Sequence, residues 1–408
     1  MICHVDVEDV KIIGAGSLGL ILAGRILDKF RSVEIFESSN SLGGVATDMF
    51  NSAGSNFFLG CQYLLASYLP NWARNSEYLL EFEHRYASLT EQNGKWNYKL
   101  DFAGPAFDIE EISQTSKSID ENKLDDRLSL YPKEISQILK MHMSKFLPVD
   151  LNLLHVSGLV SLGITRITTV SNDSELVRLK QRDNLIDKLY GVSRDTLGLK
   201  FETSYIPKFG YSKYWSTYIS QSNFKRNASI RYDCRLDKKS FDNNVLGNVK
   251  GLKAWCADPR QMIQLTTSEK LDSLSYMVHS YGVSIESYSG PKLPFYINVF
   301  SATDPLIRLF FYLLDSEVKV SIDSLKKYNS STEITNVLVK FATSAHITLK
   351  VSNQDVAYAR TRRYFPISKN DYEILRTSTN GLVGSNWLDT GTYLYDRKSR
   401  LELIFDQI

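Results

Sequence analysis

The sequence predicts an α/β fold in which a parallel strand–helix–strand unit near the N-terminus is extended by a helical insertion and an antiparallel sheet. An apolar run close to the N-terminus leads directly into a glycine-rich turn and an apolar helix. Residues 111–200 carry apolar side chains at helical spacing, whereas residues 265–371 alternate short apolar runs with polar turns. Because helices repeat every ~3.6 residues and strands every second residue, these patterns separate the two kinds of element.

The composition is that of a folded globular protein. The chain has 408 residues, enough for about two or three domains. Lys and Arg number 48 and Asp and Glu number 46, which gives a formal net charge of +2. Hydrophobic residues make up 43% of the chain, so a disordered polyelectrolyte is excluded. A general nucleic-acid binder is not expected, because such proteins carry a basic excess that replaces counterions.

Targeting and metal signals are absent from the sequence. We see no N-terminal signal peptide and no window of about 18 uncharged apolar residues that would predict a membrane helix. We therefore expect a cytoplasmic protein without an integral membrane segment. The four cysteines lack the spacing of zinc modules, so we expect reduced thiols and no metal site. They are Cys3, Cys61, Cys234 and Cys256.

The N-terminal segment predicts a dinucleotide-binding turn. Val10–Ile13 is suited to a buried strand, Gly14–Gly19 reads GxGxxG, and Val33–Phe36 is a second apolar run. In this motif the first glycine allows the tight turn, the second lets the backbone approach a pyrophosphate, and the third lets the helix pack closely on the strand. The N–H groups and dipole at the helix start would hold the pyrophosphate. A glycine-rich turn without a ligand is the alternative.

An acidic residue ends the second apolar run. Glu37 stands where a carboxylate can accept hydrogen bonds from the ribose hydroxyls of a dinucleotide. The same charge would repel the 2′-phosphate of NADP, so that cofactor is disfavoured. The expected dinucleotide contacts in this segment are Gly14, Ala15, Gly16, Ser17, Leu18, Gly19, Glu37 and Ser38.

A pair of glycines follows soon after this acid. Gly43 and Gly44 would let a further backbone segment run close to the phosphates and the ring of the cofactor. An acid, a short spacer and then Gly-Gly resembles the extended fingerprint of flavoproteins of the glutathione-reductase type. The resemblance implies that the cofactor is FAD rather than NAD.

Segments further along the chain resemble UDP-galactopyranose mutases and, more broadly, flavin amine oxidases. Residues 56–64 are similar to the mutase loop beside the flavin, which implies FAD contacts from Gly60, Cys61 and Gln62. A hairpin with strands near 86–90 and 96–100, joined by an Asn-Gly turn, follows in the same order as in the family. Residues 205–215 resemble the helix start that precedes the next strand of the FAD domain.

The C-terminal region resembles the same family. Residues 362–367 are similar to its YYPV-like segment, and residues 391–396 to its terminal G-T-Y run. In that superfamily the N-terminus of the last helix points at the flavin, where its N–H groups stabilise charge. The resemblance thus adds Gly384, Gly391, Thr392 and Tyr393 as FAD contacts. Two departures are present: Cys61-Gln62 replaces the family's histidine, and Gly384 is followed by serine instead of arginine.

The resemblance divides the chain into one discontinuous domain and two insertions. We expect a Rossmann-like FAD-binding domain at 1–60, 201–264 and 372–408. An inserted helical domain is expected at 111–200, and an antiparallel, substrate-facing sheet at 61–110 and 265–371.

Arginines and tyrosines are the candidate substrate contacts. Arg308 can bind a diphosphate bidentately, although a surface ion pair is the alternative. Three arginines occur within four residues at 360–363, a density that favours an anion. Side chains alternate along a strand, so only one of two tyrosines spaced by two residues need face the site. The catalytic candidates are Arg308, Arg362, Arg363, Tyr393 and Tyr395.

The sequence leaves three functions open. The resemblance implies an FAD-dependent mutase of surface polysaccharide biosynthesis, in which N5 of the reduced flavin attacks the anomeric carbon of a nucleotide-linked sugar. The sugar ring then opens and recloses without net redox change. A net oxidoreductase of the amine oxidase or desaturase type is the first alternative, and a non-catalytic flavin-binding subunit is the second. The expected partner is a small molecule and not a nucleic acid; an oligomer is neither required nor excluded.

Overall fold

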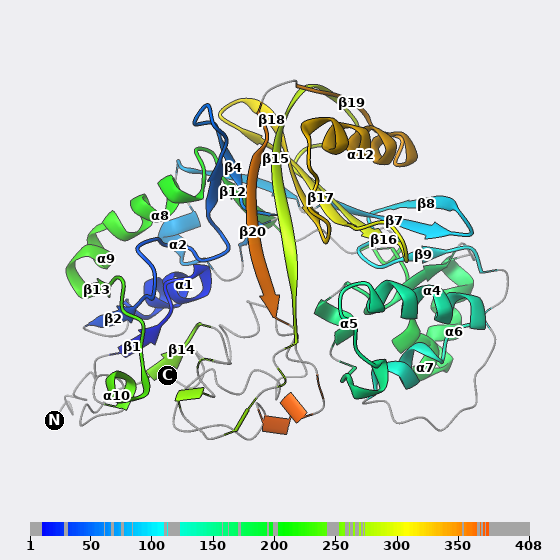
Figure 1. Cartoon of the computed structure of the whole chain (residues 1–408), viewed down its shortest axis with the longest axis horizontal. Helices are drawn as coiled ribbons and strands as arrows, with labels where there is room; N and C mark the ends of the chain where they lie inside the picture. Colours follow the sequence, from blue (N-terminus) through cyan, green and yellow to red (C-terminus); the bar gives the residue numbers. More distant parts are fainter. Residues whose placement is uncertain are drawn as a thin grey trace.

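The computed structural model describes residues 10–27, 32–60, 62–66, 69–74, 77–83, 85–109, 112, 123–156, 158–161, 163–169, 173–193, 196–198, 203–242, 253–257, 261, 264–265, 269–270, 272, 274–352, 355–364, 368, 370–371 and 373–374. Figure 1 shows a parallel sheet with its helices at the left, a helical unit at the right and a large sheet across the top. The α/β fold class predicted from the sequence is confirmed.

The parallel sheet gathers strands from distant parts of the chain. Its order is β13-β2-β1-β14, and every neighbouring pair is parallel. The predicted first strand and the helix after it are present, as β1 and α1. The strands are β1 (Val10–Ile13), β2 (Val33–Phe36), β13 (Ala228–Arg231) and β14 (Lys253–Trp255), and the helices are α1 (Ser17–Ile26), α8 (Tyr211–Ser220), α9 (Ser222–Asn227) and α10 (Lys238–Phe241).

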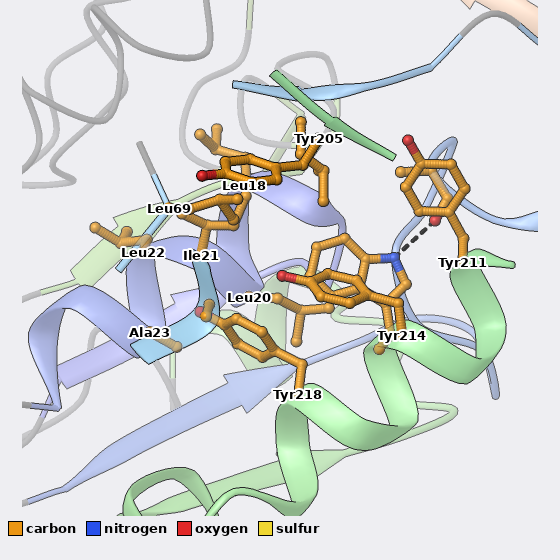
Figure 2. Packing of buried hydrophobic residues seen from close by; sticks show 14 of the residues in the cluster. Leu18, Leu20, Ile21, Leu22, Ala23, Leu69, Tyr205, Tyr211, Tyr214 and Tyr218 are labelled. Atoms are coloured by element: carbon orange, nitrogen blue, oxygen red, sulfur yellow. Dashed lines mark hydrogen bonds between the residues drawn. The ribbon is translucent and has the colours of Figure 1, made fainter. Parts of the chain in front are cut away.

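Helix α1 is buried between this sheet and the aromatic face of α8. Figure 2 shows Tyr214 and Tyr218 of α8 projecting toward the apolar side chains of α1. The close approach depends on Gly24, because a Cβ there would lie 2.0 Å from the Tyr218 hydroxyl. Trp215 is fully buried, and its indole Nε1 donates to the Ala46 carbonyl oxygen at 2.7 Å. Helix α8 therefore holds the loop between β2 and β3 (Asp48–Phe50) in place.

Short strands connect the parallel sheet to the rest of the molecule. A hairpin of β3 (Asp48–Phe50) and β4 (Asn56–Phe58) leads to a small sheet of order β5-β12-β6. The remaining elements are β5 (Leu64–Leu65), α2 (Asn71–Arg74), β6 (Leu79–Glu83) and β12 (Thr203–Pro207).

The helical unit surrounds its own apolar core. Its longest described helix starts beside a proline, with Pro132 as the N-cap of α4. The sequence did not predict a small parallel sheet, of order β11-β10-β9, because strands of two or three residues are too short to show a period. The helices are α3 (Leu124–Leu128), α4 (Lys133–Ser144), η1 (Leu151–Leu153), α5 (Gly158–Ser161), α6 (Asp173–Arg182) and α7 (Asn184–Leu189); the strands are β9 (Ala106–Phe107), β10 (Ile167–Thr169) and β11 (Tyr190–Gly191).

The large sheet has the order β19-β15-β18-β17-β16-β7-β8, with β20 also paired to β15. The predicted hairpin is confirmed as β7–β8, whose turn has positive φ at Asn93 (52°) and Gly94 (73°). One pair, β16–β7, is parallel, so the sheet is mixed instead of purely antiparallel. Its strands are β7 (Arg85–Gln92), β8 (Lys95–Leu100), β15 (Ser275–Ser289), β16 (Phe295–Phe300), β17 (Leu306–Leu314), β18 (Glu317–Ser324), β19 (Thr348–Val351) and β20 (Ala357–Tyr364).

The two faces of this sheet have different neighbours. One face packs against α12 (Ser331–Ser344) through an apolar cluster that includes Phe341, and we call it the outer face. The other, the inner face, contacts the β3–β4 hairpin: the Phe58 N–H donates to the Tyr312 hydroxyl at 2.9 Å, and the Ser321 hydroxyl donates to the Phe58 carbonyl at 2.8 Å. Among the described helices, none is long and apolar enough to cross a membrane.

Candidate functional site

The glycine-rich turn after β1 has the geometry that its sequence predicts. Gly14 has φ of +99°, a left-handed conformation that favours glycine. A Cβ at Gly19 would lie 2.0 Å from the Gly14 carbonyl oxygen, so only glycine lets α1 start this close to the strand. A Cβ at Gly16 would meet no atom of the described residues within 4 Å. The second glycine therefore faces open space, as expected where a ligand approaches the backbone.

A second loop closes over this turn. The Gly43 N–H donates to the Ala15 carbonyl oxygen at 2.9 Å, and the Ser17 N–H donates to the Gly43 carbonyl oxygen at 3.1 Å. A Cβ at Gly44 would lie 3.2 Å from the Gly16 Cα, so the backbones approach closely. Gly43 has an additional requirement that the sequence did not reveal, since a Cβ there would lie 2.3 Å from the Trp215 Nε1.

The N-terminus of α1 carries the positive end of the helix dipole. The Leu20 N–H is the first to bond within the helix, to the Gly16 carbonyl oxygen at 3.0 Å. The N–H groups of Leu18 and Gly19 therefore have no carbonyl partner in their own helix. No acidic residue lies in the first turn to offset the helix dipole. This arrangement suits an anionic group such as a pyrophosphate.

Glu37 lies at the mouth of the turn and is half-buried. Its Oε2 accepts from the Ala15 N–H at 2.7 Å, and its Oε1 accepts from the Ser39 N–H at 2.8 Å. The exposed Ser38 contributes a longer bond, from its hydroxyl to Oε1 at 3.3 Å. These bonds fix the carboxylate at the end of β2, the position predicted for a ribose contact.

The inner face of the large sheet carries a buried ion pair. Asp323 of β18 is fully buried, and its Oδ2 accepts from the Arg308 Nε at 2.7 Å. The Ser280 hydroxyl donates to the Asp323 Oδ1 at 2.6 Å, and the Arg308 Nη1 donates to the Tyr296 hydroxyl at 3.1 Å. The charge of Arg308 is therefore balanced by an acid directly opposite it on the next strand. The sequence did not predict this role for Asp323.

Arg363 lies on the same inner face. It pairs in register with Tyr276 of β15, on the side of the strand that also carries Ser280. The Arg363 Nε and Nη2 are buried and have no hydrogen-bond partner among the described residues. Burial raises the pKa of the Tyr276 phenol, while the nearby charges of Arg308 and Arg363 act in the opposite direction. Among the described residues, the guanidinium of Arg363 therefore lacks a hydrogen-bond partner for two of its nitrogens.

The arginine cluster at 360–363 is divided between the two faces. Arg360 and Arg362 pair with His279 and Met277, which point away from the inner face, and both arginines are exposed. Because side chains alternate along a strand, Arg362 cannot share a ligand on the inner face with Arg363. The predicted group of inward-facing arginines is thus reduced to Arg308 and Arg363.

Gly60 links the glycine-rich turn region to the inner face. It has φ of +68°, and a Cβ there would lie 3.2 Å from both carboxylate oxygens of Asp323. The neighbouring Gln62 is buried. Six further predicted contacts lie outside the described residues: Cys61, Gly384, Gly391, Thr392, Tyr393 and Tyr395.

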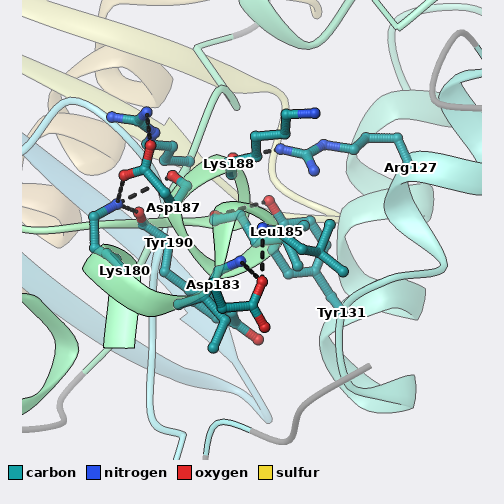
Figure 3. Close-up of polar contacts among 11 residues, drawn as sticks. Arg127, Tyr131, Lys180, Asp183, Leu185, Asp187, Lys188 and Tyr190 are labelled. Carbon is teal, nitrogen blue, oxygen red and sulfur yellow. Dashed lines mark hydrogen bonds and ion pairs between the residues drawn. The ribbon is translucent and has the colours of Figure 1, made fainter. Parts of the chain in front are cut away.

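A pocket of about 470 Å³ lies between the helical unit and the edge of the large sheet. Its walls include Tyr86, Phe102, Arg166, Lys180 and Asp187. The Lys180 Nζ lies 2.8 Å from the Asp187 Oδ1, and the Arg166 Nη2 lies 3.4 Å from Oδ2 of the same carboxylate. Figure 3 shows Lys180 and Asp187 within this polar network. Asp101 also lines the pocket, so two acids and two bases stand in its walls.

This pocket adjoins the Arg308 site. Tyr86 is in register with Tyr296, which accepts the hydrogen bond from Arg308. Two residues after Tyr296 on β16, the Asn298 Nδ2 donates to the Ala103 carbonyl oxygen of the pocket wall at 3.2 Å. The sequence did not predict the pocket, because its residues come from separate segments without a shared motif.

The comparisons with known proteins identify the fold. No protein-family model and no curated protein matches the sequence. A solved structure of reduced UDP-galactopyranose mutase superposes with a TM-score of 0.61, over 97% of this chain and 94% of that chain, at 13% identity. An engineered variant of putrescine oxidase superposes with a TM-score of 0.50, over 98% of this chain and 97% of that chain, at 10% identity. This chain therefore has the overall fold of UDP-galactopyranose mutase, as its sequence motifs predicted.

Proposed function

We propose that this protein is an FAD-dependent enzyme that acts on a nucleotide-linked sugar. The observation that carries the proposal is the cradle formed by the Gly14–Gly19 turn and Gly43-Gly44, which leaves open space in front of Gly16. The likeness in fold to UDP-galactopyranose mutase over nearly the whole chain supports it. The cationic inner face of the sheet agrees with an anionic substrate.

The residues of the cradle fit FAD. The pyrophosphate would be held by the N–H groups of Leu18 and Gly19, and a ribose would lie beside the fixed carboxylate of Glu37. Gly60, on the loop that reaches Asp323, would face the ring system. The bound flavin would supply the nucleophilic or redox-active ring that the amino acids lack.

The inner face would orient the substrate. Arg363 would bind a phosphate oxygen with Nε and Nη2, which the described residues leave unpaired. Asp323 would hold the Arg308 guanidinium in a fixed orientation next to the Tyr296 hydroxyl, where its positive charge would face the substrate. The adjoining pocket, at about 470 Å³, falls within the usual size of small-ligand sites and would take the nucleoside. Its aromatic walls, Tyr86 and Phe102, are suited to a base.

The balance of charge favours a phosphate ester over an amine as the substrate. Arg308 and Arg363 both lie close enough to Tyr276 to act on its pKa, and the ion pair with Asp323 offsets one of the two charges within the described part of the chain. A protonated amine would be repelled there, whereas a diphosphate would be attracted and its departure as a leaving group assisted. A net oxidoreductase is nevertheless the second candidate, since the putrescine oxidase variant covers the chain equally well.

The cofactor assignment is tested with two glycine variants. Gly16→Val should fold, because the position has an extended backbone (φ −63°, ψ 170°) and no atom of the described residues would lie within 4 Å of a Cβ. It should bind FAD at least ~100-fold more weakly, since the new side chain occupies the ligand space. Gly19→Ala should instead destabilise the apoprotein, because its Cβ would meet the Gly14 carbonyl oxygen at 2.0 Å.

The measurements are flavin absorbance, FAD titration and thermal unfolding of the apoproteins. A wild-type protein that is colourless and takes up no FAD would contradict the proposal. For the reaction, nucleotide sugars are screened with the reduced and the oxidised protein. Turnover that needs reduction but consumes no reductant supports a mutase, whereas oxygen-linked oxidation of an amine supports the second candidate.

A further inference from the structure

Strand β20 carries a row of cationic and aromatic side chains on the outer face of the large sheet. Arg360 and Arg362 are exposed at alternate positions, and Tyr358, two residues earlier, is 41% exposed. The Lys327 Nζ lies 5.8 Å from the centre of the Tyr358 ring. The Nδ1 of His279, which is in register with Arg360, lies 2.9 Å from the Tyr358 hydroxyl oxygen. We call these five residues the outer cationic strip.

The strip has positive charge without acidic partners among the described residues. The ion pairs of the described chain leave out Arg360, Arg362 and Lys327. Burial lowers the pKa of His279, and the charges of Arg360 and Lys327 lower it further. The same positive charges that lower this pKa would favour an incoming anion. Three formal positive charges therefore lie next to two aromatic rings.

The strip also lies on an edge strand. Among the described strands, β20 pairs with β15 alone, and Figure 1 shows it running along the margin of the large sheet. An edge strand presents main-chain N–H and C=O groups that can pair with a further strand. Alternate residues on such a strand are about 6.6–6.8 Å apart, and an added strand repeats its side chains at the same spacing.

We propose that the outer cationic strip docks an extended acidic segment of another protein, which adds to the large sheet beside β20. The acidic side chains of that segment would lie opposite Arg360 and Arg362, and the main-chain bonds would fix its register. A strand is favoured over a nucleic acid because the strip combines three cations with a sheet edge that pairs with no other described strand. The proposal does not depend on the catalytic function, since the strip faces away from Arg308 and Arg363.

Synthetic peptides provide the test with the full-length protein. The probe is a labelled peptide in which glutamate alternates with threonine. One control peptide has glutamine in place of glutamate, and a second has the same composition with its glutamates in one block. Fluorescence anisotropy should show binding of the alternating peptide, weakened by added salt, and markedly weaker binding of both controls. Hydrogen exchange in β20 should slow on binding.

Charge-reversal variants locate the contact. Arg360→Glu with Arg362→Glu should weaken binding of the alternating peptide by about tenfold or more. Lys225→Glu with Arg226→Glu changes the net charge equally, at exposed positions of α9, and should leave the affinity unchanged. Equal binding of the block peptide, an unaffected strip variant, or preferential binding of a single-stranded oligonucleotide would each overturn the proposal. FAD absorbance of the variants shows that their fold is retained.

Discussion

Arg362 and Arg363 are adjacent in the sequence, yet they face opposite sides of the large sheet. Arg363 pairs in register with Tyr276 on the inner face, whereas Arg362 pairs with Met277 and is exposed on the outer face. Two residues of the same type therefore have different electrostatic surroundings. A density of arginines in a sequence indicates an anion site, but the period of the strand decides which of them can share it.

These two arginines form a matched pair for mutation. Arg363→Met should weaken binding of a nucleotide-diphosphate sugar by about 1–3 kcal/mol, because it removes a charged donor from a partly buried site. Arg362→Met should leave that affinity unchanged and should weaken only the binding of the acidic peptide. Isothermal titration with both ligands measures the four affinities. Loss of sugar binding in the Arg362 variant would contradict the division between the faces.

Asp323 is expected to hold Arg308 in place. Asp323→Asn removes the charge that accepts from the Arg308 Nε at 2.7 Å and leaves a guanidinium only partly exposed to water. We expect a loss of about 2–4 kcal/mol in the free energy of unfolding, because breaking a buried pair leaves one charge uncompensated. The double variant Asp323→Asn with Arg308→Met should recover part of this loss. Urea unfolding of the four proteins gives the coupling energy, and simple additivity would rule out the pair.

At the scale of elements, α4 is attached to the large sheet by polar contacts. The His142 Nδ1 lies 2.9 Å from the Ser301 carbonyl oxygen, and the Lys145 Nζ donates to the Asp304 carbonyl oxygen at 2.9 Å. Burial lowers the pKa of Lys145 to about 8, although Asp304 and Glu91 act in the opposite direction. The contact between the helical unit and the sheet therefore includes an amine that is costly to keep charged.

This amine should make stability depend on pH. The pKa of Lys145 is about 8 in the folded chain and 10.5 ordinarily, so above about pH 8 the unfolded chain binds more protons. The free energy of unfolding should therefore rise with pH there, by about 1–2 kcal/mol up to pH ~9.5, before tyrosines begin to titrate. Lys145→Met should remove this rise. Urea unfolding at several pH values measures it, and an identical slope in the variant would refute the assignment.

At the scale of the whole molecule, local motifs predicted the elements that depend on neighbouring residues. The βαβ unit and the β7–β8 hairpin could be predicted because their turns need glycine or Asn-Gly at fixed positions. The pairing of Arg308 with Asp323 and the pocket around Lys180 could not, because they join side chains from separate strands and helices. The need for glycine at position 43 could not be fully predicted either, because part of it comes from the close approach of Trp215 on a distant helix.

The proposed cofactor site couples the parallel sheet to the large sheet. The Gly14–Gly19 turn belongs to the first, while Gly60 lies on a loop whose strand β4 is bonded to Tyr312 and Ser321 of the second. FAD bound across both should therefore stabilise them together, by about 2.7 kcal/mol at a concentration 100-fold above its dissociation constant. Hydrogen exchange should slow in β1 and in β17 alike, and Gly16→Val should abolish both effects. Slowing confined to β1 and β2 would show instead that the two sheets unfold independently and that the ligand is held by the parallel sheet alone.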